Sequence, residues 1–195
     1  MCVPLSEKQY NKNGFIPQHG GYKNLYSYKK AEIIYDSTVY FCNKYFDKRD
    51  RTIDQMVQAA RSGKQNIAEA SMASGTSKET EIKLTNVARA SLEELLIDYP
   101  DFLRIRKFKE WEKNHLYVKR LQELNKDPNC TYETFRKGVE NSNPEISANV
   151  IIGLIKVASY LLSKQIQKLE EDFLKEGGLR ERMTQARINQ RRNRL

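Results

Sequence analysis

The chain has 195 residues and a formal net charge of +9, with 39% hydrophobic and 30% charged residues. This balance is typical of amphipathic helices with wide solvated faces. No run approaches the roughly 20 consecutive apolar residues of a membrane span, so we expect no transmembrane helix and no membrane partner.

Residues 1–21 are polar and contain Pro4, Gly14 and Pro17, which predicts a flexible N-terminal arm. A first helix is predicted over residues 22–46, because apolar positions recur there at steps of three and four. The short charged linker that follows favours an antiparallel neighbour. The apolar positions are Tyr28, Ala31, Tyr35, Thr38, Cys42 and Tyr45.

A second helix is predicted to begin at Thr52, with Gln55 completing a capping box. Its seam of apolar positions contains small residues, among them Gly63, which costs up to ~1 kcal/mol of helix propensity relative to alanine and so suggests close packing. A third helix is predicted to begin at Thr76 or Ser77 and to end or kink at Pro100. The second seam is Ile53, Met56, Ala60, Gly63, Ile67 and Ala70.

Residues 101–142 allow one helix through a basic segment, broken near Pro128, and a short helix over residues 131–139. The last long helix has a clear start, with Asn143 as N-cap and Pro144 at the first helical position. It is strongly apolar, extends for about 30 residues, and ends at Gly177. The arginine-rich remainder is predicted to extend as a solvated helix.

These elements predict an all-α chain whose core is an antiparallel up-and-down four-helix bundle, with an additional helical C-terminal region. The predicted regions are the arm (1–21), helices one to three (22–103), a basic and aromatic helical insertion (104–142), a long apolar helix completing the bundle (143–178) and an Arg-rich tail (179–195).

The sequence offers little for catalysis or cofactor binding. None of the common nucleophile, metal or phosphate-loop motifs is present. His19 and His115 are far apart and are expected to be surface residues, so we expect no metal site and no cofactor. The odd number of widely spaced cysteines fits neither a disulfide framework nor a zinc site, and favours the cytoplasm. We therefore expect a protein that is not an enzyme.

One set of polar residues stands out on the second and third helices. Ser62, Asn66 and Glu69 share one helix face beside the small-residue seam, and Ser91 and Glu94 form a similar pair. The set could be a solvated stripe, a hydrogen-bond network that fixes helix register, or, least favoured, a catalytic group. We expect the network.

Several short stretches resemble a known family. They are Leu25 with YKKA (28–31), QAARS (58–62), NIAE (66–69) and ASLEEL (90–95). These resemble the four-helix-bundle proteins encoded in intervening sequences of bacterial large-subunit ribosomal RNA genes, a family similar to the accessory variability determinant of diversity-generating retroelements. Residues 144–178 also resemble a suffix domain that follows this bundle in some bacterial proteins.

The resemblance covers about residues 22–103 and implies a non-enzymatic homopentamer. The retroelement member binds its reverse transcriptase and nucleic acid, so the resemblance implies such partners. The apolar seams of the first two helices also offer more apolar surface than a lone small bundle needs, which predicts a homo-oligomer, with a pentamer favoured.

The positive charge of the chain is concentrated in two segments. Residues 22–103 are neutral, whereas residues 104–120 and 179–195 each carry +5. The first hypothesis is an oligomeric adaptor that binds RNA, DNA or a ribonucleoprotein; the alternative is a protein–protein scaffold. Trp111, Phe108 and Tyr117 could stack on bases. The candidate phosphate contacts are Arg104, Arg106, Lys107, Lys109, Lys113, Lys119, Arg120, Arg180, Arg182, Arg187, Arg191, Arg192 and Arg194.

Overall fold

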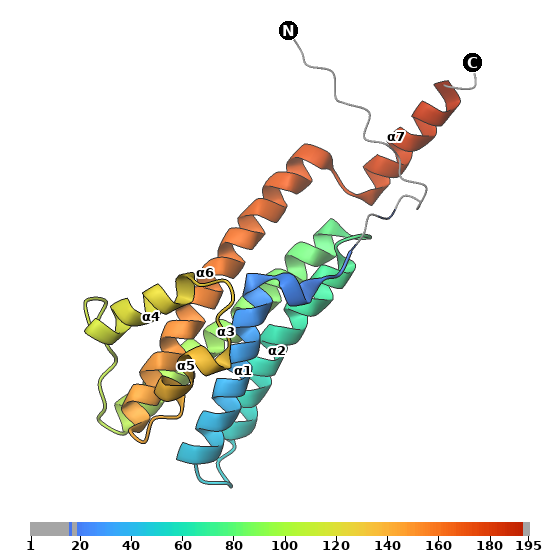
Figure 1. The fold of residues 1–195 in the computed structure, drawn as a ribbon. Coiled ribbons are helices and arrows are strands. Elements are labelled where there is room, and N and C mark those ends of the chain that lie inside the picture. Colours follow the sequence, from blue (N-terminus) through green and yellow to red (C-terminus); the bar gives the residue numbers. More distant parts are fainter. Residues whose placement is uncertain (1–15, 17–18, 193–195) are drawn as a thin grey trace.

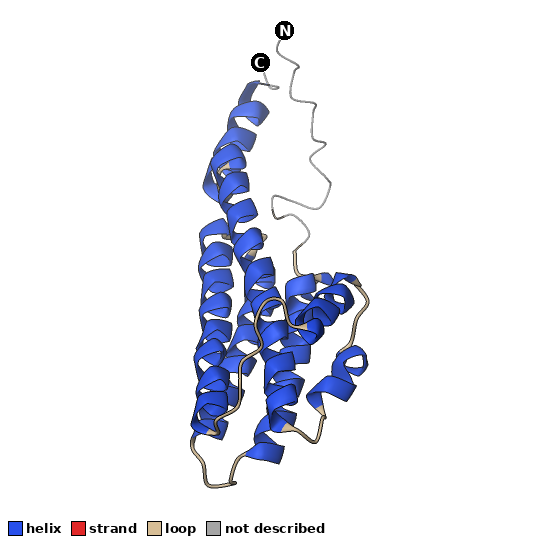
Figure 2. Ribbon diagram, turned by 90° about the vertical axis from the view of Figure 1, so that its left-hand side faces the viewer, coloured by secondary structure: helices blue, strands red, loops and turns tan. Residues whose placement is uncertain are grey.

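The structure is a computed structural model, and it describes residue 16 and residues 19–192. Over that part of the chain the fold is all-α, without a strand (Figures 1 and 2), which confirms the predicted class. The elements are the 3-10 turn η1 (Tyr22–Asn24) and the helices α1 (Tyr26–Tyr45), α2 (Thr52–Ala73), α3 (Lys78–Ile105), α4 (Leu116–Lys126), α5 (Tyr132–Val139), α6 (Pro144–Glu176) and α7 (Leu179–Arg192).

Four long helices form the body of the molecule. α1 packs on α2, α2 on α3, α3 on α6, and α6 back on α1, so each contacts two others in a closed ring. The chain turns back after α1 at residues 46–51 and after α2 at residues 74–77 (Figure 1). The short helices α4 and α5 lie against α6, and α5 also touches α1.

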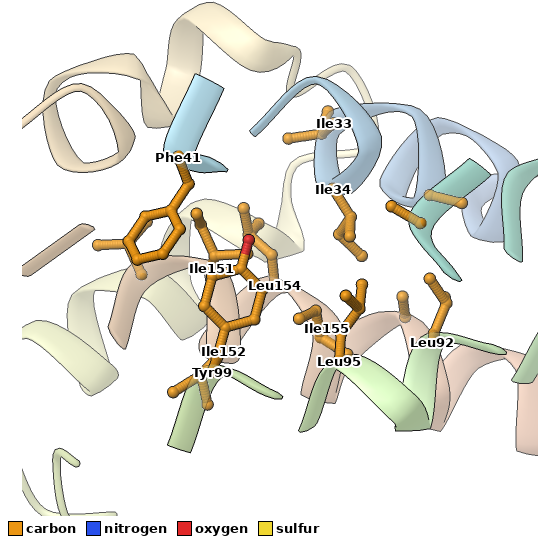
Figure 3. Packing of buried hydrophobic residues seen from close by; sticks show 14 of the residues in the cluster. Ile33, Ile34, Phe41, Leu92, Leu95, Tyr99, Ile151, Ile152, Leu154 and Ile155 are labelled. Atoms are coloured by element: carbon orange, nitrogen blue, oxygen red, sulfur yellow. The ribbon is translucent and has the colours of Figure 1, made fainter. Parts of the chain in front are cut away.

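The core lies inside this ring, where side chains of α1, α3 and α6 meet (Figure 3). Phe41 packs its ring edge against Tyr99 and Phe102 at centroid distances of 5.0 and 4.7 Å. The buried Tyr99 hydroxyl donates to Thr38 Oγ1 at 3.1 Å, which satisfies its one polar group. α6 contributes Ile151, Ile152, Leu154 and Ile155 to the same cluster.

The seam of small residues on α2 is used inside the chain. A Cβ at Gly63 would lie 2.6 Å from Cδ2 of the buried Leu92, so glycine leaves the space that this leucine fills where α2 packs on α3. Met56, Ala60, Ile67 and Ala70 are buried beside it. The α2 part of the apolar surface that motivated the oligomer prediction is therefore largely buried by packing within one chain.

Helix starts agree with the sequence in part. Asn143 caps α6, its Oδ1 accepting the Glu145 N–H at 2.9 Å, and Pro144 occupies the first helical position, as predicted. The capping box predicted for Thr52 and Gln55 is wrong. The N-cap residue of α2 is Arg51, and the Thr52 N–H donates to Asp50 Oδ1. α3 is capped by Ser77, one of its two predicted starts.

Pro100 does not end α3, so the first of the two outcomes predicted for it, an end or a kink, is wrong. The helix continues to Ile105, with Tyr99, Phe102 and Leu103 buried on either side of the proline. An interior proline costs about 3 kcal/mol, and burying three large side chains at roughly 1.5–3 kcal/mol each outweighs that cost. The short helix predicted over 131–139 is confirmed as α5, and the break near Pro128 lies just after α4.

The stretch Pro144–Arg192, which contains α6, includes an 18-residue window with mean hydropathy 1.7, enough in length and composition to cross a membrane. Of that window, 61% is buried inside the fold. Core helices of folded chains pass the same test, and the apolar residues of α6 are the ones that fill the core.

Most of the predicted arm, residues 1–15, 17 and 18, lies outside the described residues. The end of the predicted arm is attached to α2, since the Gly20 N–H donates to the Ser71 carbonyl at 3.0 Å. α7 extends beyond the end of the four long helices (Figure 2) and buries none of its residues. That helix is the solvated extension that the sequence predicted.

Candidate nucleic-acid interface

The basic segment 104–120 is not one helix, contrary to expectation. α3 ends within it, and residues 106–115 form a loop before α4 begins at Leu116. The Phe108 N–H donates to the Leu103 carbonyl and the Lys107 N–H to the Arg104 carbonyl, which is the Schellman closure of a helix. Lys107 has φ +61°, the left-handed conformation that glycine usually adopts at this position.

One buried side chain of α6 holds this loop. Asn149 Oδ1 accepts the Trp111 N–H at 2.7 Å, and its Nδ2 donates to the Lys109 carbonyl at 2.9 Å and the Glu145 carbonyl at 2.8 Å. Asn149 is 4% exposed. Because both ends of the amide are used, the loop backbone is fixed to α6 beside Trp111.

An aromatic cluster stands where the loop meets α4. Trp111 is half-buried and stacks on His115 at a centroid distance of 4.6 Å with an interplanar angle of 11°. Tyr117 lies tilted against both rings. His115 also caps α4, its Nδ1 accepting the Tyr117 N–H at 3.3 Å. Indole, imidazole and phenol rings thus gather inside the basic segment.

All seven predicted cations of this segment are exposed. Arg104 pairs with Asp101 at 2.8 Å, and the Arg106 guanidinium lies 3.9 Å from the Phe102 ring centroid. The other five form no ion pair within the described part of the chain, and they are free to face an anionic partner. They are Lys107, Lys109, Lys113, Lys119 and Arg120.

The second basic segment forms α7. Arg180, Arg187, Arg191 and Arg192 are exposed and Arg182 is half-buried, whereas Arg194 lies outside the described residues. The Gly178 N–H donates to Glu181 Oε2 at the start of this helix. α7 and the 106–115 loop lie at opposite ends of the molecule (Figure 1), so the two basic segments make two separate surfaces.

The polar set on α2 and α3 is only partly joined. Ser62 and Ser91 share a hydrogen bond of 3.0 Å across the two helices, and Asn66 Nδ2 donates to the Ser62 carbonyl and hydroxyl. Glu69 and Glu94 are exposed and make no hydrogen bond to this group. Their inclusion in the network was wrong: both carboxylates are exposed to solvent, and sharing a helix face with Ser62 does not bring Glu69 within hydrogen-bond distance of the group.

Ser62, Ser91 and Glu94 instead line an open groove of about 880 Å³ between α2 and α3. Ile97, 65% exposed, and Asp98 lie along it. Burial raises the pKa of the Asp98 carboxyl above its ordinary value, and the neighbouring Glu94 and Asp101 carboxylates raise it further. The groove is therefore partly apolar and acidic, the opposite in charge of the two basic segments.

One buried cation was not predicted from the sequence. Lys30 is 4% exposed, and its Nζ donates to Asn125 Oδ1 at 2.5 Å and contacts Cys130 Sγ at 2.7 Å, with the Phe135 ring 5.2 Å away. Its position on the buried face of α1 was visible from the helical period. Its partners, about 100 residues later in the chain, gave no signal. The contacts tie α1 to the region of α4 and α5.

Within the described residues, no group of three or more His, Cys, Asp or Glu side chains could hold a metal ion. Burial raises the pKa of the Cys42 thiol to about 12, and the Asp98 and Asp50 carboxylates act in the same direction. Cys42 is fully buried in the core, as its apolar position on the first helix predicted.

No family model, curated protein or solved structure matches this chain.

Proposed function

We propose that this protein is a non-enzymatic, cytoplasmic adaptor that binds RNA, DNA or a ribonucleoprotein through its two basic segments. The observation that carries the proposal is where the charge lies. Each segment carries a net charge of +5, and most of its described cations are exposed, at the end of α3, on the loop, on α4 and on α7, whereas residues 22–103 are neutral.

The chemistry of the exposed groups suits phosphate contacts. Arginine, which dominates α7, has a planar guanidinium that stays ionised and donates to two phosphate oxygens at once. Lys109 and Lys113 each line a pocket together with Trp111, whose ring belongs to an aromatic cluster of the kind that stacks on bases. Contacts of this kind are largely independent of sequence and weaken with salt.

We further propose that the four long helices form an antiparallel up-and-down bundle and that the bundle assembles with further copies of itself, a pentamer being the form that the family resemblance implies. The closed ring of contacts supports the bundle.

The groove between α2 and α3, with Ile97 exposed, supports a contact between subunits of the proposed oligomer. Repeated basic segments in an oligomer would add weak contacts through avidity. By the same resemblance, a reverse transcriptase is a candidate partner.

A protein–protein scaffold without a nucleic-acid role is the second candidate. The same groove favours it, since its exposed apolar residues and its carboxylates would suit a basic, partly apolar protein surface rather than nucleic acid.

Fluorescence anisotropy with labelled single-stranded and duplex oligonucleotides at low salt tests the proposal. Neutralising five arginines of α7 to Gln should weaken binding more than about tenfold on every sequence alike. The matched control neutralises five exposed cations elsewhere and should change binding much less. Absence of binding by the full chain would favour the scaffold instead. The variant changes Arg180, Arg182, Arg187, Arg191 and Arg192; the control changes Lys48, Arg49, Arg51, Arg61 and Lys137.

A further inference from the structure

A cavity of about 430 Å³ lies where the 106–115 loop and α4 cross α6. This size falls within the range of small-molecule sites. α4 turns Val118, Leu121 and Gln122 toward it, and α6 presents Ile152 and Val157 from the opposite side. Lys119 and Arg120, on the other face of α4, take no part in lining it.

The walls of the cavity are apolar and partly aromatic. Leu121 and Ile152 are buried, Val118 and Val157 are half-buried, and the ring of Trp111 completes the lining. Gly153 of α6 makes room for Leu121 of α4, since a Cβ at this position would lie 3.1 Å from Leu121 Cδ1. These surfaces suit a flat, largely apolar group.

The polar groups around the cavity differ in what they can still bind. The amides of Asn125 and Asn149 already bond within the protein, and Lys156 pairs with Glu110 at 2.7 Å. Lys113 and Gln122 have no hydrogen-bond or ion-pair partner in the part of the chain that the structure describes. Among the described lining residues, the unused polar groups thus include the Lys113 ammonium, the Gln122 amide and the Tyr160 hydroxyl, and the amide can both donate and accept.

The position of the indole is set before any ligand arrives. The Trp111 backbone is fixed by Asn149, which is itself buried, and the ring rests on His115. A wall held in this way loses little conformational freedom on binding, so its contacts convert efficiently into affinity.

We propose that this cavity binds a nucleotide, with the base against Trp111 and the aliphatic walls, its edge at the Gln122 amide and its phosphate at Lys113. The nucleotide is either free or an unstacked unit of a single strand. Proteins bind unstacked bases by stacking on aromatic rings and by hydrogen bonds to the base edge. The single-strand form rests on the proposed function, whereas the free form does not.

Intrinsic fluorescence tests the site directly, because Trp111 is the only tryptophan in the chain. The full chain is titrated with each nucleoside monophosphate and with short single-stranded oligonucleotides, excited at the red edge of the indole band where nucleotides do not absorb. The controls are inorganic phosphate and uncharged nucleosides. We expect saturable quenching by a nucleotide or an oligonucleotide, and weaker quenching by the nucleoside.

Two variants check the location. Val157→Phe fills the cavity, and Lys113→Glu reverses the unpaired charge at an exposed position that folding does not need. Each should weaken quenching more than about tenfold. Val87→Phe and Lys137→Glu are matched controls at exposed positions on α3 and α5 and should leave it unchanged.

Quenching by monophosphates identifies a free-nucleotide site, and quenching by oligonucleotides alone identifies an unstacked base. The inference is overturned if nothing quenches the folded protein, if Lys113→Glu binds as well as the natural chain, or if nucleosides bind as tightly as monophosphates. The variant with a neutralised α7 separates this result from the proposed function. If this variant no longer binds labelled oligonucleotides while monophosphates still quench Trp111, the two sites act independently. If the unaltered chain binds oligonucleotides in the anisotropy assay and nothing quenches Trp111, only the cavity site is rejected.

Discussion

The ring of four long helices and the basic periphery, which consists of the 106–115 loop, α4 and α7, differ in burial and in charge. In the ring, aromatic and aliphatic side chains from α1, α3 and α6 are buried and net charge is absent over residues 22–103. In the periphery, α7 buries nothing, α4 buries only Leu121, and the positive charge is exposed. Stability and the proposed binding therefore reside in separate residues, so each should be removable without the other.

The largest expected effect comes from the centre of the ring. Phe41→Ala removes a fully buried ring that contacts Tyr99 and Phe102, and should lower the free energy of unfolding by about 3–5 kcal/mol. Urea denaturation followed by circular dichroism measures it. Tyr117→Ala, on a 52% exposed ring in the periphery, should cost much less. Equal losses would abolish the distinction between the two regions.

The next effect concerns Asn149, the buried side chain of α6 that holds the 106–115 loop. Asn149→Ala leaves the Trp111 N–H and the Lys109 carbonyl without their partner, at roughly 1–3 kcal/mol. It should also release the loop, seen as faster proteolysis within residues 106–115 and altered Trp111 fluorescence. Asn114→Ala, an exposed change in the same loop, is the control and should alter neither. A loop equally protected in both variants would mean that Asn149 does not hold it.

A smaller effect of opposite sign is expected at the end of α3. Lys107→Gly relieves the left-handed backbone, which costs an L-residue about 1–2 kcal/mol; part of this gain is offset because glycine has more freedom in the unfolded chain. The melting temperature should therefore rise slightly. Lys109→Gly, at a residue without positive φ, should lower it. A fall in both variants would contradict the Schellman closure.

The smallest effect concerns the acidic groove. The folded pKa of Asp98 is raised above 3.8 by burial and by Glu94 and Asp101, so the folded state holds this proton more tightly than the unfolded chain. Its contribution to stability is consequently present at low pH and is lost as pH rises through the folded pKa. Asp98→Asn should raise the melting temperature slightly at neutral pH and less in acid. Asp54→Asn, which removes a first-turn carboxylate of α2, should lower it.

Local chemistry made much of the fold predictable. The start of α6 follows from Asn143 and Pro144, and its place in the core follows from its apolar period. The end of α3 could not be predicted, because a lysine occupies the position where glycine normally signals the turn and because Pro100 allowed the helix to end about five residues too early. There the burial of Phe102 and Leu103, a tertiary effect, overrides the local preference.

The candidate interface was predictable in its charges but not in its shape. Counting charged residues along the chain located both basic segments. Nothing in the sequence marked Asn149 as the residue that holds the loop, because it is an ordinary polar residue within the α6 pattern. The Lys30 contacts with Asn125 and Cys130 were hidden for the same reason. Contacts between distant segments depend on the packed fold, and helical period reports only which face of a helix is buried.

Deleting residues 179–195 is the most direct test of the central claim that binding and stability are separable. The deletion removes +5 of charge, and none of the residues that the structure describes there is buried. The measurement is the slope of log affinity for a mixed-sequence oligonucleotide against log salt, together with the melting temperature. We predict an unchanged melting temperature and a slope flattened by about 0.7–0.9 for each phosphate that the shortened chain no longer neutralises. An unchanged slope, or a collapse of the melting temperature, would contradict this claim.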